Sequence, residues 1–162
     1  MPGQSARAHL GNGLLVAVQI LLMVLVVMGP SSTGTAEVWP APWGLVARIS
    51  GIALLACGGL LALGGALRMG DNLTPSSHPR EGAPLLVGGA YGVVRHPLYG
   101  GLILAALGWA LFVYGPLTLL YACVLFVWLD LKTRHEERLL LAAHKDYAEY
   151  RSRVRKLLPF VY

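Results

Sequence analysis

The feature that most constrains this chain is the separation of charged from apolar residues along its length. Residues 1–67 contain three charged side chains, whereas the segment from Asp130 to Tyr162 contains 13. Only 13% of all residues are charged, against about 25% in ordinary soluble domains. A small soluble domain has no room to enclose so much apolar surface, and a disordered chain needs the opposite composition. We therefore expect one membrane-embedded domain, no larger than a single small unit, that ends in a polar tail.

Charge-free apolar runs give the expected architecture, because a membrane helix needs roughly 20 mostly apolar residues. The sequence predicts an all-α integral membrane protein with four transmembrane helices at about 10–28, 49–67, 98–114 and 117–131. Gly115-Pro116 interrupts the last long run, and proline breaks a helix, so the third and fourth spans are expected to form a tight hairpin. Residues 68–97 form a loop in this scheme, and residues 132–162 form a helical tail.

The distribution of Lys and Arg predicts the orientation, since positive residues accumulate on the cytoplasmic side. Arg7, the basic residues of loop 68–97 and all those from Lys132 onward lie on one side of the four spans, while the linker 29–44 has none. Both termini are therefore expected in the cytoplasm, in a multi-pass protein of the inner (cytoplasmic) membrane. Arg48 is the exception, and its side chain is expected to snorkel to the interface.

One alternative concerns the start of the chain. Arg7 before an apolar segment also fits a cleaved signal peptide, which would leave three spans. At the other end, the basic run 151–156 is expected to meet anionic lipid headgroups.

The excess of positive charge follows the membrane topology, so we expect no nucleic-acid partner. We also expect no metal, because the two cysteines and five histidines show no metal-ligand spacing. The oligomeric state is left open.

Polar residues that are able to carry chemistry occur in two places. The first is the Pro- and Gly-rich loop 68–97, expected to be non-helical. Pro97 suits the first turn of the third span, which places Arg95 and His96 just before a helix N-terminus, where an anion is favoured. The second is the segment that leaves the fourth span, where Arg134 and Glu137 share a helix face. Spacing alone favours a solvated helix with ordinary ion pairs there.

A longer pattern connects these two places. It starts with Gly89-Ala-Tyr-Gly-Val-Val-Arg-His-Pro-Leu-Tyr-Gly100, continues with Glu136-Glu137, and closes with Tyr147-Ala-Glu-Tyr150, Arg153-Val154 and Leu158-Pro-Phe160. Over residues 72–162 it resembles the isoprenylcysteine carboxyl methyltransferase family and its relatives among the phospholipid methyltransferases. The resemblance implies an integral membrane enzyme that uses S-adenosylmethionine without a Rossmann domain.

The resemblance also implies roles for individual residues. The residues that match cofactor contacts are Leu85, Leu86, Tyr91, His96, Pro97, Tyr99 and Glu136. Arg95 and Glu137 are the expected catalytic residues: Arg95, with His96, would hold the donor carboxylate, and either glutamate would pair with the donor ammonium or with Arg95. Lys132 and Arg134 are the expected substrate residues, which would aim an acidic acceptor at the methyl group.

The acceptor is expected to be lipid-like and to enter from the bilayer. The first expectation, by resemblance, is the carboxylate of a prenylcysteine-like compound, which needs only orientation. A phospholipid amine or a small lipophilic thiol is the alternative, and an amine would require a base such as Glu137 or His135. A membrane reductase of related fold that binds NADPH, and an inactive membrane subunit, are the alternatives from other classes.

Overall fold

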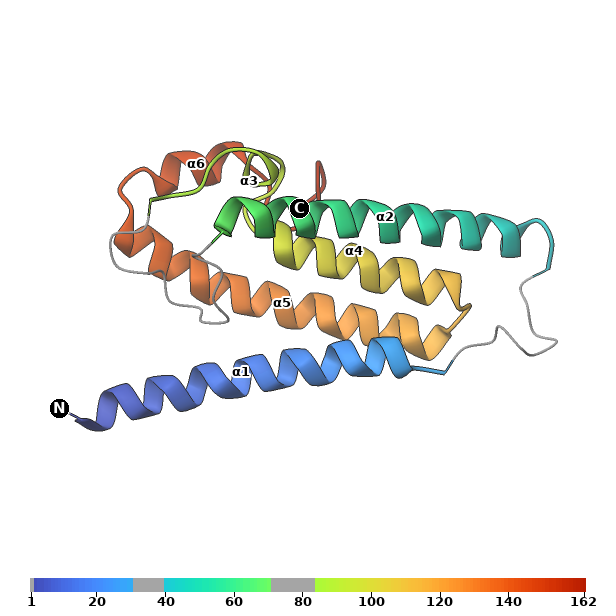
Figure 1. The fold of residues 1–162 in the computed structure, drawn as a ribbon, viewed down its shortest axis with the longest axis horizontal. Helices are drawn as coiled ribbons and strands as arrows, with labels where there is room; N and C mark the ends of the chain where they lie inside the picture. The colour runs from blue at the N-terminus through green and yellow to red at the C-terminus, as the bar shows by residue number, and fades with distance from the viewer. Residues whose placement is uncertain (1, 31–39, 71–83) are drawn as a thin grey trace.

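The computed structural model describes residues 2–30, 40–70 and 84–162, with side chains from residue 13 onward. Within these ranges the protein contains six helices and no sheet, which confirms the all-α expectation. Their bounds are α1 Pro2–Met28, α2 Trp43–Met69, α3 Ala90–Val93, α4 Pro97–Phe112, α5 Pro116–Ala143 and α6 Tyr147–Arg153. The four long helices run along the length of the molecule, and α3 and α6 lie together at one end (Figure 1).

The apolar helices differ in length. Among the described residues, α2 and α5 are each long and apolar enough to cross a membrane, whereas Gly13–Met28 of α1 and all of α4 form shorter apolar helices. With 16 residues, α4 is about 24 Å long, less than the hydrocarbon thickness of about 30 Å. The described residues thus contain two helices of membrane-spanning length and two shorter apolar ones, and a complete set of four spans stays a prediction.

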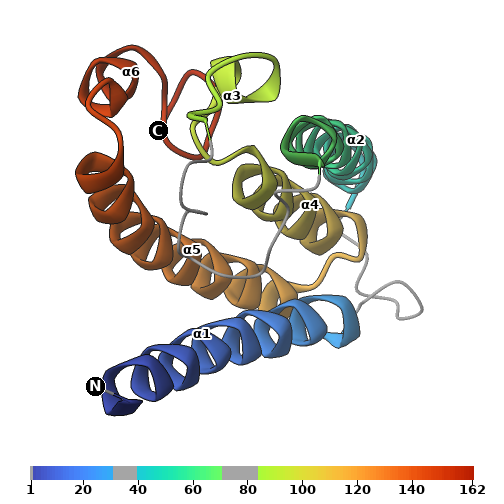
Figure 2. The same cartoon turned by 60° about the vertical axis from the view of Figure 1, so that its left-hand side comes forward.

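Glycines bring α2 and α4 into backbone contact. Gly44, Gly51, Gly58 and Gly65 recur every seven residues of α2, and all are buried. A Cβ atom on Gly58 would lie 2.6 Å from the carbonyl oxygen of Gly101 in α4. Small residues allow apolar helices to approach this closely when no hydrophobic effect drives them together. In Figure 2, α4 lies between α2 and α5, and α1 lies along α5.

The connection between α4 and α5 is the short turn predicted at Gly115-Pro116. Helix α4 ends at Phe112, and α5 begins at Pro116. Tyr114 has a φ of 52°, a left-handed conformation that is rare for a large side chain. Its hydroxyl donates a hydrogen bond to the Gly44 carbonyl oxygen at 2.7 Å, so the turn is tied to the start of α2.

At the opposite end, two expectations need correction. The loop 68–97 contains the short helix α3, because the chain makes one helical turn after Gly89, whose φ is 64°; residues 71–83 of this loop lie outside the described residues. The tail is only partly helical. Helix α5 continues to Ala143, α6 has seven residues, and the chain after Val154 is a non-helical segment packed on the start of α4.

Candidate active site

The junction before α4 is held by the C-terminal segment. Pro97 occupies the first turn of α4 and His96 caps it, as the sequence predicted. The backbone N–H groups of Arg95 and His96 donate to the carbonyl oxygens of Arg155 at 2.8 Å and Lys156 at 3.1 Å. Residues far apart in the sequence therefore meet beside the start of a helix.

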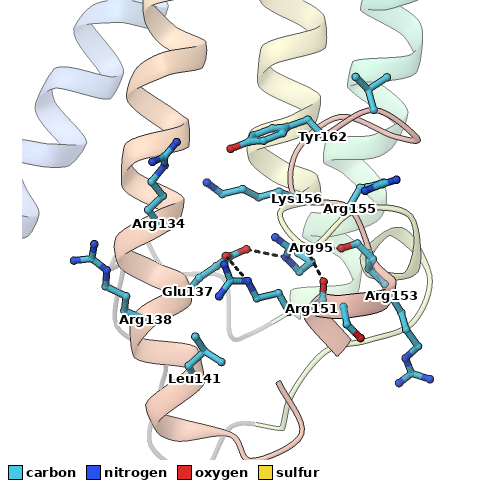
Figure 3. Close-up of a pocket in the computed structure, with 13 residues that line it drawn as sticks. Arg95, Arg134, Glu137, Arg138, Leu141, Arg151, Arg153, Arg155, Lys156 and Tyr162 are labelled. Atoms are coloured by element: carbon cyan, nitrogen blue, oxygen red, sulfur yellow. Dashed lines mark hydrogen bonds and ion pairs between the residues drawn. The ribbon is translucent and has the colours of Figure 1, made fainter. Parts of the chain in front are cut away.

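Arg95 and Glu137, the two predicted catalytic residues, form a buried ion pair. Arg95 Nε lies 2.7 Å from Glu137 Oε1, and the two side chains are 10% and 5% exposed. Arg95 Nη1 also donates to the carbonyl oxygens of Arg151, at 3.0 Å, and Val154. Arg151 Nε lies 3.4 Å from the other oxygen of Glu137, so both guanidinium groups converge on one carboxylate (Figure 3).

The charge state of Glu137 follows from this arrangement. Burial opposes ionisation, but the neighbouring His96 and Arg95 outweigh it and lower the pKa of Glu137 to about 2. Glu137 lies beyond the apolar part of α5, one turn past Thr133. Its carboxylate is therefore ionised at neutral pH, so it is better suited to positioning a cation than to accepting a proton.

Three predicted cofactor residues form a second group beside this pair. Tyr99 donates its hydroxyl hydrogen to Glu136 Oε1 at 2.8 Å, and the ring of His96 stacks on that of Tyr99 with centroids 6.0 Å apart. His96 Nδ1 lies 3.8 Å from Glu136, and Nε2 lies 3.4 Å from Glu137. Nε2 is buried, and its contact with Glu137 does not have the geometry of a hydrogen bond.

Lys132, on α5, joins the site where α5 contacts α1. Its ammonium is buried, lies 4.9 Å from the centroid of the Tyr99 ring, and donates to Gln19 Oε1 at 2.8 Å. Gln19 was not among the predicted site residues. The signal was present, because Gln19 is the one polar interruption in the first apolar run from Leu10 to Met28, apart from Asn12 near its start. The solvated helix expected for this part of α5 holds for only one face: Arg134, His135 and Arg138 are exposed, whereas Lys132, Thr133 and Glu137 are buried.

The remaining predicted residues lie at the edges of this group. Leu85 and Leu86 are half-buried in the segment before α3, and Pro97 packs against Gly65 of α2. Arg134, predicted to share a face with Glu137, instead pairs with Asp130 at 2.8 Å, and its side chain is 59% exposed. Arg134 therefore lies beside the site rather than inside it.

Tyr91 is buried on the far side of the junction. Its carbonyl oxygen accepts a hydrogen bond from the Tyr150 hydroxyl at 2.5 Å, which ties α3 to α6. Burial, and then the Glu136 carboxylate, raise the pKa of Tyr91 to about 12, so the phenol stays protonated. Burial likewise raises the pKa of Tyr150 to about 12. Both tyrosines are neutral at any physiological pH.

A buried ionic cluster that was not expected from the sequence lies around Asp130, two helical turns before Glu137 on α5. Asp130 Oδ1 accepts hydrogen bonds from Lys156 Nζ at 2.5 Å and the Tyr162 hydroxyl at 3.0 Å. The expectation that the run 151–156 meets headgroups is therefore wrong for Lys156, which is only 7% exposed. An acidic residue between Leu129 and Leu131 was the sequence signal for this cluster.

Between α5 and the C-terminal segment is a cavity of about 730 Å³. Figure 3 shows Glu137 and Leu141 on its α5 side and Lys156 and Tyr162 on the other. It is strongly basic, because seven Arg and Lys residues but only one carboxylate line it. No group of three metal-ligating side chains occurs in the described ranges.

Comparison with known protein families gives a match over most of the helical bundle. The family described as phospholipid methyltransferase matches residues 46–146, more than half of the chain, from α2 to the end of α5. No curated protein and no solved structure matches. The matched region includes the Arg95–Glu137 pair, the Tyr99–Glu136 contact and Lys132, but ends before the C-terminal segment.

Proposed function

Because this chain belongs to the phospholipid methyltransferase family, whose members are S-adenosylmethionine-dependent methyltransferases, we propose that it methylates a lipophilic acceptor at the cytoplasmic face of the membrane. The observation that carries this proposal is the meeting of Arg95, His96 and Tyr99 with Glu136 and Glu137 where α4 begins and the apolar part of α5 has ended. A place where an apolar helix face gives way to a polar one suits both a soluble donor and a membrane-dissolved acceptor.

The residues present fit the methyl donor. When bound, the donor supplies an electrophilic methyl group on a sulfonium. Glu136, whose side chain is 13% exposed, is placed to hold the donor ammonium. His96 Nε2 is a buried polar atom without a hydrogen-bond partner among the described residues, as expected where a ligand completes the set. Arg95 uses Nε and Nη1 for protein contacts, which leaves Nη2 for the donor carboxylate.

For the acceptor, we propose a carboxylate carried by a prenylcysteine-like compound. Support comes from Lys132, a buried cation near Tyr99 at the contact of α1, α4 and α5. Orientation of an anion requires no base, which agrees with an ionised Glu137. His135, the other candidate base, is exposed. The phospholipid amine is the second candidate, favoured by the description of the matched family.

For the topology, we propose four membrane-crossing segments with both termini in the cytoplasm. Support comes from the position of α3, α6 and the start of α1 toward the same end of the bundle, opposite the α4–α5 turn (Figure 1). Between Arg48 and Arg68, the large side chains exposed on α2 are apolar, as a lipid-facing helix requires: Ile49, Ile52, Leu60, Leu63 and Leu67.

Calorimetry on the purified protein in detergent tests the donor. We expect binding of S-adenosylhomocysteine and none of NADPH; binding of NADPH alone would favour the reductase. Arg95→Ala and Glu136→Ala should each weaken S-adenosylhomocysteine binding, and unchanged affinity in both would remove these residues from the site. Methyl transfer to a prenylcysteine analogue, to phosphatidylethanolamine and to a lipophilic thiol, measured side by side, then identifies the acceptor class.

A further inference from the structure

Asp130 is a charged side chain in an apolar part of α5. It follows the fully buried Leu129, and its own side chain is 10% exposed. Three groups neutralise or hydrogen-bond it: Lys156 Nζ at 2.5 Å, the Tyr162 hydroxyl at 3.0 Å and Arg134 at 2.8 Å. The methyl-transfer site described above uses none of these contacts.

The C-terminal segment is fastened to α5 at two levels. Asp130 and Glu137 are seven residues apart, which places them on one face of the helix at a separation of about 10 Å. Lys156 and Tyr162 of this segment reach the first carboxylate, and Arg151, on the adjoining helix α6, reaches the second. In Figure 3 the side chains of Lys156 and Tyr162 extend from the C-terminal segment toward α5.

The same segment also determines where Arg95 lies. The backbone N–H of His96 donates to the carbonyl oxygen of Lys156, the residue that binds Asp130. The guanidinium of Arg95 donates to the carbonyl oxygens of Arg151 and Val154. A displacement of Lys156 would therefore shift the backbone that orients both Arg95 and His96.

We propose that Asp130, Lys156 and Tyr162 are positioning residues that lock the C-terminal segment onto α5 and so hold Arg95 and His96 in the geometry that binds the methyl donor. The inference rests on the proposed function for the identity of the ligand. Its argument is energetic. Apolar residues of similar volume replace a buried ion pair without loss of stability in many proteins. Stability alone therefore does not require ionic groups here. Holding the C-terminal segment in one position along α5 does require them, because charge-assisted hydrogen bonds are directional.

The decisive variant removes both charges together, Asp130→Leu with Lys156→Met, so that neither is left buried and unpaired. Two measurements are made on it in detergent. The first is ligand-free: amide hydrogen exchange of the peptide containing Arg95 and His96, whose N–H groups bond to the C-terminal segment. The second is the affinity for S-adenosylhomocysteine by calorimetry. Glu149→Gln is the matched control, because it breaks only an exposed ion pair with Arg153 within α6, the helix that precedes the C-terminal segment.

We expect the double variant to melt close to the wild-type temperature, to exchange the Arg95–His96 amides faster, and to bind S-adenosylhomocysteine about tenfold more weakly, the loss expected for one charge-assisted hydrogen bond. The control should match wild type in all three. Wild-type exchange and affinity in the double variant would overturn the proposal.

If the double variant does not fold, Tyr162→Phe replaces it, since this change removes one hydrogen bond to Asp130 and little volume. Faster exchange and weaker binding then support the lock, and wild-type values overturn it. Absence of S-adenosylhomocysteine binding by the wild-type protein would instead contradict the proposed function. The exchange measurement would still decide whether the Asp130 cluster fixes Arg95 and His96.

Discussion

Glu136 and Glu137 are neighbours in the sequence, yet their carboxylates meet different partners. Glu137 is held between two guanidinium groups, while Glu136 accepts a hydrogen bond from Tyr99 and lies near His96. Successive residues on a helix point about 100° apart, so one faces the C-terminal segment and the other faces α4. Two identical side chains thus acquire separate tasks from their position on α5.

Replacement of Glu137 by Gln tests the buried pair. The pKa of Glu137 in the folded protein, about 2, lies below its ordinary value of 4.5. The ionised carboxylate therefore stabilises the fold fully above about pH 4.5, and this contribution is lost as the pH falls toward 2. We expect Glu137→Gln to lower the melting temperature at pH 7, by an amount that corresponds to about 3 kcal/mol for a broken buried pair.

The measurement is thermal unfolding in detergent at several pH values between 7 and 2.5. The gap between wild type and Glu137→Gln should be constant down to about pH 5 and should narrow below it. Comparison with the variant removes the contribution of the other carboxylates. Equal melting temperatures at pH 7, or a gap that widens in acid, would contradict the ion pair.

Gln19 tests the assignment of Lys132 to the acceptor. Gln19→Leu removes the hydrogen bond that orients the Lys132 ammonium, and Gln19→Glu replaces it with a competing carboxylate. If Lys132 binds an anionic acceptor, both variants raise the acceptor KM, with the larger increase for Gln19→Glu, and neither changes S-adenosylhomocysteine affinity. A merely structural contact predicts the reverse order, because the carboxylate would hold Lys132 more firmly.

Most of the residues in this site could be predicted from the sequence, but few of their partners could. The Arg-His-Pro and Glu-Glu motifs indicated the two segments, and the structure brings them together. The pairing of Glu137 with Arg95 joins residues 42 positions apart; the sequence offered it only as one alternative for either glutamate, and local spacing favoured Arg134 as the partner of Glu137. Asp130 and Lys156 were missed for the same reason. An ion pair between distant segments is visible in the sequence only as a single charged residue in each segment, without its partner nearby.

At the scale of the helices, the apolar runs predicted four long elements, with boundaries that differ most at the polar ends. Hydropathy indicates where a helix can be embedded but not where it stops: the helical tail predicted for 132–162 is the continuation of α5, which ends at Ala143. The apolar runs also did not predict which helices pack against each other. The repeat of Gly44, Gly51, Gly58 and Gly65 marks the face of α2 that meets α4, and this signal was in the sequence.

Adjacent glycines of α2 offer a matched pair for this contact. A Cβ atom on Gly58 would lie 2.6 Å from a backbone oxygen of α4, whereas one on Gly59 would meet nothing within 4 Å. We expect Gly58→Ala to destabilise the protein by about 1–3 kcal/mol, because backbone has to move. Gly59→Ala should be neutral or stabilising by up to about 1 kcal/mol. Thermal unfolding in detergent measures both, and equal stability of the two variants would exclude close α2–α4 packing.

The two ends of the molecule carry different side chains. At the end where α3 and α6 lie, the Arg95–Glu137 pair and the basic cavity meet. At the other end, the guanidinium of Arg48 lies 5.3 Å from the centroid of the Tyr114 ring, beside the α4–α5 turn. An aromatic ring and an arginine at the end of an apolar helix are typical of a membrane interface. Between the ends, Cys57 and Cys123 are exposed on apolar helices.

Thiol labelling in intact cells tests this arrangement. A membrane-impermeant maleimide reacts only with thiols that face water outside the cell. We expect Trp43→Cys, exposed at the start of α2, to be labelled without permeabilisation, and Glu149→Cys, on exposed α6, to be labelled only after it. Cys57 and Cys123 should stay unlabelled in both conditions, because lipid covers them, and should react once detergent and denaturant remove it. Labelling of Glu149→Cys in intact cells would reverse the orientation, and labelling of the native cysteines in the bilayer would place α2 or α5 outside the membrane.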